Sequence, residues 1–182
     1  MPKRINIKRM LDIILLNKMN EGKNIMKKKL NLNLGELKIA QLGFVFKDIE
    51  SKAKLMEEIY GMPKFTFMDD VRHEIMNRDV KSQINLKLGF SRFFDMQIEL
   101  IEWKEGECIY KDFLDEGREG LQHVSFFVDE LDPYIEEFKR CGFDVINQGQ
   151  IGKQRFAYFD TEDTLGLLLE FQETVKRKKK KA

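Results

Sequence analysis

The strongest constraint on the fold is an internal repeat. Residues 39–49, IAQLGFVFKDI, align without a gap with residues 121–131, LQHVSFFVDEL. In both segments an apolar run leads directly into a helical pattern, which is typical of a strand followed by a helix. The sequence therefore predicts two copies of one supersecondary unit.

The periodicity after each repeat predicts the remaining elements. Helices are expected at residues 49–60 and 131–141. Strands are expected at residues 64–68, 81–92 and 95–103 in the first half, and at residues 144–148, 155–160 and 166–172 in the second half. The polar stretch 69–79 is expected to be a loop or a short helix, with His73 at the surface. The order strand, helix, strand, strand, strand thus occurs twice.

These two halves divide the chain into five parts. We expect a basic N-terminal extension (1–36), a first βαβββ module (37–104), a linker (105–118), a second βαβββ module (119–174) and a basic tail (175–182). In the extension, apolar residues approximate one helix face, so a basic amphipathic helix, a packing arm and a segment without fixed structure are the alternatives. With 182 residues, 42% of them hydrophobic, the chain can bury the core of one compact domain.

Charge and cysteine content exclude several classes of protein. Lys and Arg number 32 and Asp and Glu number 31, which excludes a uniformly basic nucleic-acid binder. The basic residues at the C-terminus would attract phosphate without specificity, so no specific nucleic-acid partner is expected. The longest apolar stretch, residues 13–16, is far below the roughly 20 residues of a membrane span. Cys108 and Cys141 lack metal-knuckle spacing, which predicts free thiols and a cytoplasmic location.

Polar residues interrupt the predicted strands at equivalent positions of the two halves. Because side chains alternate across a strand, Gln41 lies on the face opposite Leu42 and Phe44, and His123 occupies the equivalent position of the second repeat. In the last strand of each half, Glu99 and Glu170 are likewise equivalent. An ionised carboxylate among Ile and Leu is costly to bury unless it is paired or binds a cation.

Two interpretations of these four residues remain open at this point. Each one alone is most simply a hydrogen-bonded core residue or a group at a sheet edge. Together, one amide, one imidazole and two carboxylates on matching faces would converge if the halves pair around a cleft. Such a donor set suits a divalent ion such as Zn, Ni, Co, Mn or Fe.

The chain also resembles a known family. The segments IAQLGFVFKDIE, MQIELIE, GLQHVSFFVDELD and RFAYFDTEDTLGLLLEF, within residues 38–173, resemble the vicinal oxygen chelate superfamily, which includes glyoxalase I, methylmalonyl-CoA epimerase, extradiol dioxygenases and bleomycin-resistance proteins. The resemblance implies an α+β fold in which two βαβββ modules form an open mixed-sheet half-barrel with a divalent metal in its cleft. It implies Gln41, Glu99, His123 and Glu170 as metal ligands. It further implies a small-molecule substrate and a homodimer, although the residues themselves leave the oligomeric state open.

The ligand set favours some branches of this superfamily over others. A Gln, Glu, His, Glu set resembles the glyoxalase I type, whereas the segment at residues 110–120 resembles the epimerase branch, in which a histidine usually stands at the position of Gln41. Extradiol dioxygenases require two histidines and one carboxylate at iron, and His73 is the only histidine besides His123.

The expected function is that of a metal-dependent isomerase or lyase. It would remove a proton alpha to a carbonyl of a small 2-oxo compound or acyl thioester and stabilise the enolate, with Glu170 as the base and Glu99 as the opposing ligand or acid. Lys153 and Arg155 are candidates for binding an acyl-CoA, with solvated surface charge as the alternative. The alternative functions are a metal-free binding or sequestering protein of the same fold and a ring-cleaving dioxygenase.

Overall fold

The computed structural model describes residues 28–175. The helix-like apolar pattern of the N-terminal extension and most of the basic tail fall on residues 1–27 and 176–182, which lie outside the described residues. The described chain starts with a short 3-10 helix, η1 (Leu34–Glu36), whose Leu34 packs with Leu30 and Leu37 against the second module. Within residues 28–175, no helix combines the length and apolar character needed to cross a membrane.

The first module follows the predicted order of elements. It contains β1 (Gln41–Val45), α2 (Ile49–Tyr60), β2 (Thr66–Asn77), β3 (Val80–Phe93) and β4 (Met96–Glu105). α2 begins where the backbone N–H of Ser51 donates to the Asp48 carboxylate at 3.1 Å, and it ends at Gly61, whose φ of 64° is left-handed. The strands lie in the order β1-β4-β3-β2, with β1 parallel to β4.

The second module repeats this arrangement. It contains β5 (Gly120–Val128), α4 (Asp132–Arg140), β6 (Val145–Ile151), β7 (Gln154–Phe159), the short α5 (Glu162–Leu165) and β8 (Leu168–Thr174). Its strands lie in the order β5-β8-β7-β6, with β5 parallel to β8. Between the modules, α3 (Ile109–Asp115) occupies the predicted linker and buries Tyr110 and Phe113 in the core.

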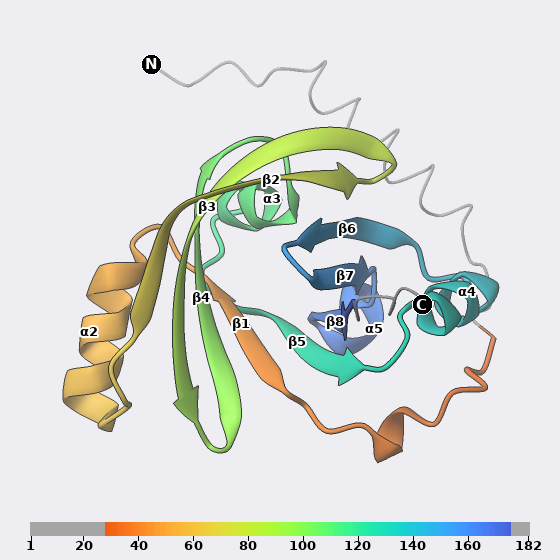
Figure 1. The fold of residues 1–182 in the computed structure, drawn as a ribbon, viewed down its shortest axis with the longest axis horizontal. Helices are drawn as coiled ribbons and strands as arrows, with labels where there is room; N and C mark the ends of the chain where they lie inside the picture. Colours follow the sequence, from red (N-terminus) through yellow and green to blue (C-terminus); the bar gives the residue numbers. More distant parts are fainter. Residues whose placement is uncertain (1–27, 176–182) are drawn as a thin grey trace, which may run out of the picture.

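The two modules join into one curved mixed sheet (Figure 1). β1 pairs with β5 in antiparallel fashion, and β2 meets β6 on the other side, which closes the sheet into a barrel. The β2–β6 contact is a short seam that pairs residues 75–77 with residues 147–149, and the rest of β2 pairs only with β3. The predicted α+β fold with two βαβββ modules is confirmed, and the seam closes one side of the predicted half-barrel.

One predicted element differs in the structure. The expectation of a loop or short helix at residues 69–79 is wrong, because β2 continues to Asn77 and the chain turns at Arg78 and Asp79, whose φ angles are 47° and 64°. This stretch is polar in sequence, but from Val71 onward it pairs residue by residue with residues 80–86 of β3, and Ile75 packs in the core with Ile84. Cross-strand pairing therefore outweighs the local composition.

Helices cover the outer face of the sheet on both modules. α2 packs on β1 and β4 through Ile49 and Ala53, which are buried against Leu100. α4 packs on the second module through Phe138, whose ring lies 4.2 Å from that of Phe159. A third cluster, which includes the buried residues of α3, fills part of the barrel interior. The polar residues described next share the rest of that interior.

Candidate functional site

The register of the sheet explains why the predicted site residues meet. Gly43 on β1 pairs with Glu99 on β4 and with His123 on β5, so these residues form one row across the inner face. In the next row, Gln41 pairs with Gln97 and Ser125, and Ser125 pairs with Glu170 on β8. Two neighbouring rows of the barrel thus carry all four predicted residues.

Two of the predicted ligands, Glu99 and Glu170, lie close to one ring nitrogen of a third, His123. His123 Nε2 lies 3.6 Å from Glu99 Oε2 and 3.6 Å from Glu170 Oε2. The His123 side chain is fully buried, and its Nε2 has no hydrogen-bond partner. An imidazole nitrogen is therefore enclosed between two carboxylates, one from each module.

A glycine creates the space for this imidazole. A Cβ atom at position 43 would lie 1.9 Å from Cε1 of His123, much closer than side chains approach one another. Gly43 is equivalent in the repeat to Ser125, which instead faces Gln41. The residues two positions after Gln41 and His123 are thus both small, and each pairs across the β1–β5 ladder with the predicted ligand of the other module.

A β-bulge fixes the tautomer of His123. The ladder between β1 and β5 shifts after Gly43, and Gln122, which simple strand alternation would put on the outer face, is buried at this bulge. Gln122 donates from Nε2 to the carbonyl of Ile109 at 3.0 Å, so its Oε1 accepts from His123 Nδ1 at 3.2 Å. A neutral His123 ring with its proton on Nδ1 presents the lone pair of Nε2 to the carboxylates, which is the form that binds metals.

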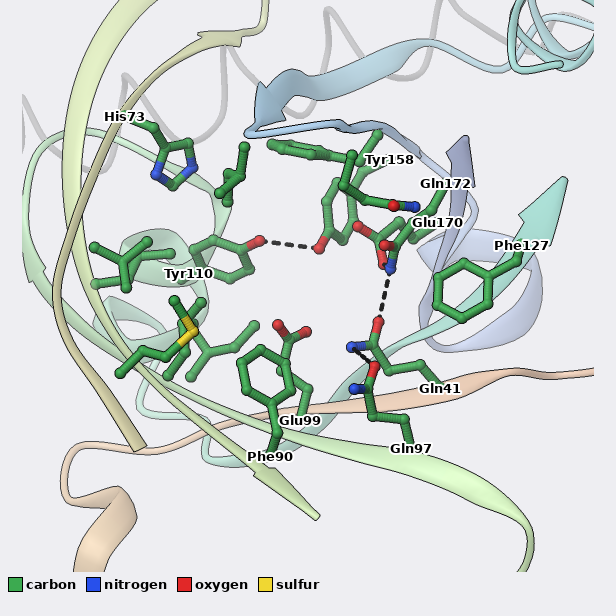
Figure 2. Close-up of a pocket in the computed structure, with 18 residues that line it drawn as sticks. Gln41, His73, Phe90, Gln97, Glu99, Tyr110, Phe127, Tyr158, Glu170 and Gln172 are labelled. Atoms are coloured by element: carbon green, nitrogen blue, oxygen red, sulfur yellow. Dashed lines mark hydrogen bonds between the residues drawn. The ribbon is translucent and has the colours of Figure 1, made fainter. Parts of the chain in front are cut away.

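Glu99, His123 and Glu170 form a polar cluster, and Gln41 is connected to it through Gln172. Gln172 Nε2 donates to Gln41 Oε1 at 2.7 Å, and the same nitrogen lies 2.8 Å from Glu170 Oε2 and 2.9 Å from Ser125 Oγ. Gln41 Nε2 in turn donates to Gln97 Oε1 at 3.0 Å (Figure 2). Sequence analysis missed Gln97 and Gln172 as site residues, although strand alternation had already placed them on the faces of Glu99 and Glu170.

The two carboxylates have different surroundings. Burial raises the pKa of Glu170; His123 and the Ser125 and Tyr158 hydroxyls lower it, whereas the charge of Glu99 raises it further. The side chain of Glu170 is 4% exposed, and that of Glu99 is 13% exposed. Among the described residues, none donates a hydrogen bond to the Glu99 carboxylate, so one acid is held in place and the other faces the pocket.

Two buried tyrosines extend this network toward α3. The hydroxyls of Tyr110 and Tyr158 lie 2.9 Å apart, and the ring of Tyr158 packs edge-on against that of His123 at 5.0 Å. Burial raises the pKa of both tyrosines well above their usual value, so both hydroxyls stay protonated. Nothing in the sequence pattern marked Tyr110, because it comes from the linker.

The cluster borders a cavity of about 290 Å³ inside the barrel. Its walls are mostly apolar side chains from β2, β3, β6 and β7, and Glu99, Glu170 and Gln41 lie at one polar end of it (Figure 2). The lining residues are Gln41, Met68, Val71, His73, Leu86, Leu88, Phe90, Gln97, Glu99, Ile101, Tyr110, Phe127, Ile151, Gln154, Phe156, Tyr158, Glu170 and Gln172. The volume is near the lower end of the range for small-molecule sites.

His73 lies in this pocket and not at the surface, which corrects the sequence-based expectation. Its side chain is half-buried, and its Nδ1 is buried without a hydrogen-bond partner. Burial lowers the pKa of His73, while the backbone of Val71 opposes this shift. His73 became interior because β2 extends through the stretch that the sequence predicted to be a loop.

The donor set of the cluster fits a divalent metal. Within residues 28–175, no three His, Cys, Asp or Glu side chains stand at the spacing of a closed metal site. However, His123 Nε2 and the oxygens of Glu99 and Glu170 face one another at 3.6 Å, and a divalent ion among them would offset the charge of the two carboxylates. One nitrogen and two carboxylate oxygens are ligands that such ions accept, and Gln41 Oε1 is connected through Gln172.

Lys153 and Arg155, the candidates for binding an acyl-CoA, lie outside the pocket. Arg155 donates to Asp132 at 2.7 Å and to Glu173 at 3.2 Å, so its charge is already paired. Neither Arg155 nor Lys153 lines the pocket that contains Glu99 and Glu170. The structure favours the alternative of surface charge for both.

Comparison with known proteins agrees with the fold. The sequence profile of the glyoxalase/bleomycin resistance protein/dioxygenase superfamily matches residues 40–159, which is most of the chain. The chain therefore belongs to this superfamily. Curated protein sequences give no match.

Solved structures with the same fold have low sequence identity. A hypothetical protein from Bacillus halodurans is 21% identical with a TM-score of 0.60, covering 81% of this chain and 99% of that one. Methylmalonyl-CoA epimerase from Mycobacterium tuberculosis is 20% identical with a TM-score of 0.53, covering 76% and 89%. A Streptomyces coelicolor methylmalonyl-CoA epimerase in complex with 2-nitronate-propionyl-CoA is 16% identical with a TM-score of 0.55, covering 79% and 98%. These similarities establish the fold alone.

Proposed function

We propose that this protein is a metal-dependent isomerase or lyase that removes a proton alpha to a carbonyl of a small 2-oxo compound or acyl thioester. The observation that carries the proposal is the partnerless His123 Nε2 between Glu99 and Glu170 at the polar end of a small-molecule pocket. An enclosed nitrogen with two acids of unlike environment suits cation binding and proton transfer in one place.

Gln41, Glu99, His123 and Glu170 would hold the metal. A bound Zn, Ni, Co, Mn or Fe ion would act as a Lewis acid that polarises the substrate carbonyl. The Nδ1–Gln122 hydrogen bond keeps the His123 ring in the required orientation. For Gln41 to bind through its oxygen, that oxygen must exchange its hydrogen bond from Gln172 for the ion.

The two acids would share the proton transfer. Glu170 takes the proton from the alpha carbon, because burial raises its pKa toward working pH and makes it a stronger base than an exposed carboxylate. Gln172 holds the Glu170 carboxylate at 2.8 Å and limits its rotation. Glu99, which faces the pocket, is the opposing ligand or the acid that returns the proton in an isomerisation.

A second candidate function is metal-free binding by the same pocket. The observation that favours it is the hydrogen bond between Gln172 and Gln41, which occupies the oxygen that a metal would need. A ring-cleaving dioxygenase is disfavoured, because iron enzymes of that kind need two histidines at one ion. His73, the other histidine, lies on the opposite side of the pocket from Gln41 and Gln97 in Figure 2.

Two further features remain predictions of the sequence analysis. We expect a homodimer, as the family resemblance implies, and a cytoplasmic location, as the buried free thiols of Cys108 and Cys141 suggest.

Exchange of substrate hydrogen with solvent tests the proposal directly. The protein in D₂O, with and without added metal, would be incubated with methylglyoxal hemithioacetals, methylmalonyl-CoA and neutral 1,2-diketones, and deuterium at the alpha carbon would be followed by NMR. We expect exchange on at least one of these classes that stops on chelation and returns with a divalent ion. Binding without exchange under any metal would favour the metal-free alternative.

A further inference from the structure

The pocket carries charge at one end only. Among the described residues that line it, Glu99 and Glu170 are the charged ones, and neither Lys nor Arg takes part. A divalent ion at the cluster would offset these two acids. A carboxylate or phosphate elsewhere in the pocket would then be enclosed without a partner, which is unfavourable in apolar surroundings.

The middle of the pocket is apolar. Leu86 and Leu88 from β3, Ile101 from β4 and Phe156 from β7 line it, and all four belong to the buried core of the barrel. A ligand that reaches the cluster must place a hydrocarbon or aromatic body against these side chains.

Two polar atoms in the wall outside the cluster lack partners. They are His73 Nδ1 and Gln154 Nε2, and both residues line the pocket. Gln154 Oε1 already accepts from the Thr174 hydroxyl at 2.9 Å, so the donor end of its amide is the one left over. Buried polar atoms without partners are rare in proteins and costly, so a ligand group that pairs with them gains affinity.

The sheet places both residues on the inner face beyond the β2–β6 seam. Ile75 is the first seam residue on β2, and His73 precedes it by two positions, which keeps it on the same face. Gln154 pairs with Ile151, and both line the pocket where β6 turns into β7. Gln154 lies four residues along β7 from Tyr158, the partner of Glu170, and His73 lies seven residues along β2 from Thr66, which is in the row of Glu99. Both polar residues are therefore displaced along their strands from the carboxylates.

We infer that the substrate is an uncharged, largely apolar carbonyl compound with a hydroxyl group at its far end, which His73 and Gln154 bind. The inference rests on the proposed function, which puts the carbonyl at the cluster. Burial keeps the imidazole of His73 neutral near pH 7, so Nδ1 and the amide N–H can pair with a hydroxyl, which both donates and accepts. Of the two substrate classes proposed above, the inference favours the small 2-oxo compound. It disfavours an acyl thioester, because the anionic carrier would find neither Lys nor Arg among the described pocket residues.

A ligand series that varies only the far end tests this inference. The probes are 1-phenylpropane-1,2-dione and its para-hydroxy and para-carboxylate derivatives, titrated calorimetrically into the full chain with Zn²⁺ at pH 7. We expect the hydroxy compound to bind about five-fold more tightly than the parent compound, and the carboxylate at least about ten-fold more weakly than the parent.

Three variants assign the effect to the two residues. His73→Leu and Gln154→Leu should each remove most of the preference for the hydroxy compound while leaving the affinity for the parent compound within about two-fold. Gln150→Leu is the matched control, because Gln150 lies on the outer face next to Ile151 and bonds only to the carbonyl of Gly152 among the described residues. It should keep the wild-type order of affinities.

The outcomes separate this inference from the proposed function. Tighter binding of the carboxylate than of the parent compound, or a hydroxyl preference that survives in both leucine variants, would overturn the inference even if deuterium exchange occurs. The predicted order of affinities without any exchange would support the inference about the ligand and count against the proposed reaction.

Discussion

The two modules share one topology, but they contribute different chemistry to the pocket. β2 and β3 have 12 and 14 residues, whereas the corresponding β6 and β7 have 7 and 6. The long hairpin of the first module supplies His73 and part of the apolar wall, and the second module adds Ile151 and Phe156 to that wall. The second module supplies the fully buried His123 and Glu170 with their hydrogen-bond partners. Duplication thus sets the positions of the polar residues, and local packing sets what each can do.

The equivalent acids show this difference most clearly. Glu99 faces the pocket without a hydrogen-bond donor from the described residues, whereas Glu170 contacts Gln172 and has a raised pKa. If burial and orientation decide which carboxylate acts as the base, replacing Glu170 and replacing Glu99 should affect the rate differently.

The largest expected effect comes from replacing these acids one at a time. Glu170→Gln keeps the shape of the side chain but removes the base, so we expect a loss of deuterium exchange of about 10²- to 10⁴-fold. Glu99→Gln should cause a smaller loss of rate and weaken metal binding. The NMR exchange assay measures both variants at saturating metal. A larger loss of rate in Glu99→Gln would reverse the assignment of the roles.

The next effect concerns the equivalent small residues Gly43 and Ser125. Gly43→Ala places a Cβ inside the space of the His123 ring, and we expect it to lower the free energy of unfolding by about 1–3 kcal/mol. Ser125→Ala removes one acceptor of Gln172 and should cost about 0.5–1.5 kcal/mol. Denaturant unfolding of both variants measures the difference. A Gly43→Ala variant as stable as wild type would show that Gly43 does not confine the imidazole.

The smallest effect is a pH dependence of stability that comes from His73 in the first module. Burial lowers the pKa of His73 in the folded chain below its ordinary value of 6.5. Between the lowered pKa and pH 6.5, the unfolded chain therefore binds a proton at His73 that the folded chain does not bind. The stability from this source is complete above pH 6.5 and is lost as the pH falls toward the lowered pKa. Relative to wild type, His73→Leu should therefore gain stability as the pH drops from 7.5 to 5.5. Thermal unfolding across this range checks it, and a constant difference would contradict it.

The repeat made most of the fold predictable from the sequence. Strand alternation placed Gln41, Glu99, His123 and Glu170 at equivalent inward positions, and the structure brings Glu99, His123 and Glu170 together. The helix at residues 49–60 was predicted to the residue, because Asp48 and Gly61 mark its ends.

The rest of the site depends on tertiary structure. Gln122 turns inward at a bulge that arises from pairing with β1, and no local pattern in the sequence predicts this bulge. His73 and Gln154 become interior only because the barrel curves until β2 meets β6. Tyr110 enters the core because the linker folds as α3. Local periodicity carries no information about these long-range contacts.

Cobalt binding tests the central claim, that the two modules hold one divalent cation among Glu99, His123 and Glu170. Co²⁺ would be titrated into the chelator-treated chain and followed by its visible absorption, with His123→Asn as the matched variant and circular dichroism as the check on folding. The account predicts saturation at about one ion per chain in wild type and loss of that absorption in folded His123→Asn. Absence of saturable binding in wild type, or an unchanged spectrum in the variant, would contradict it.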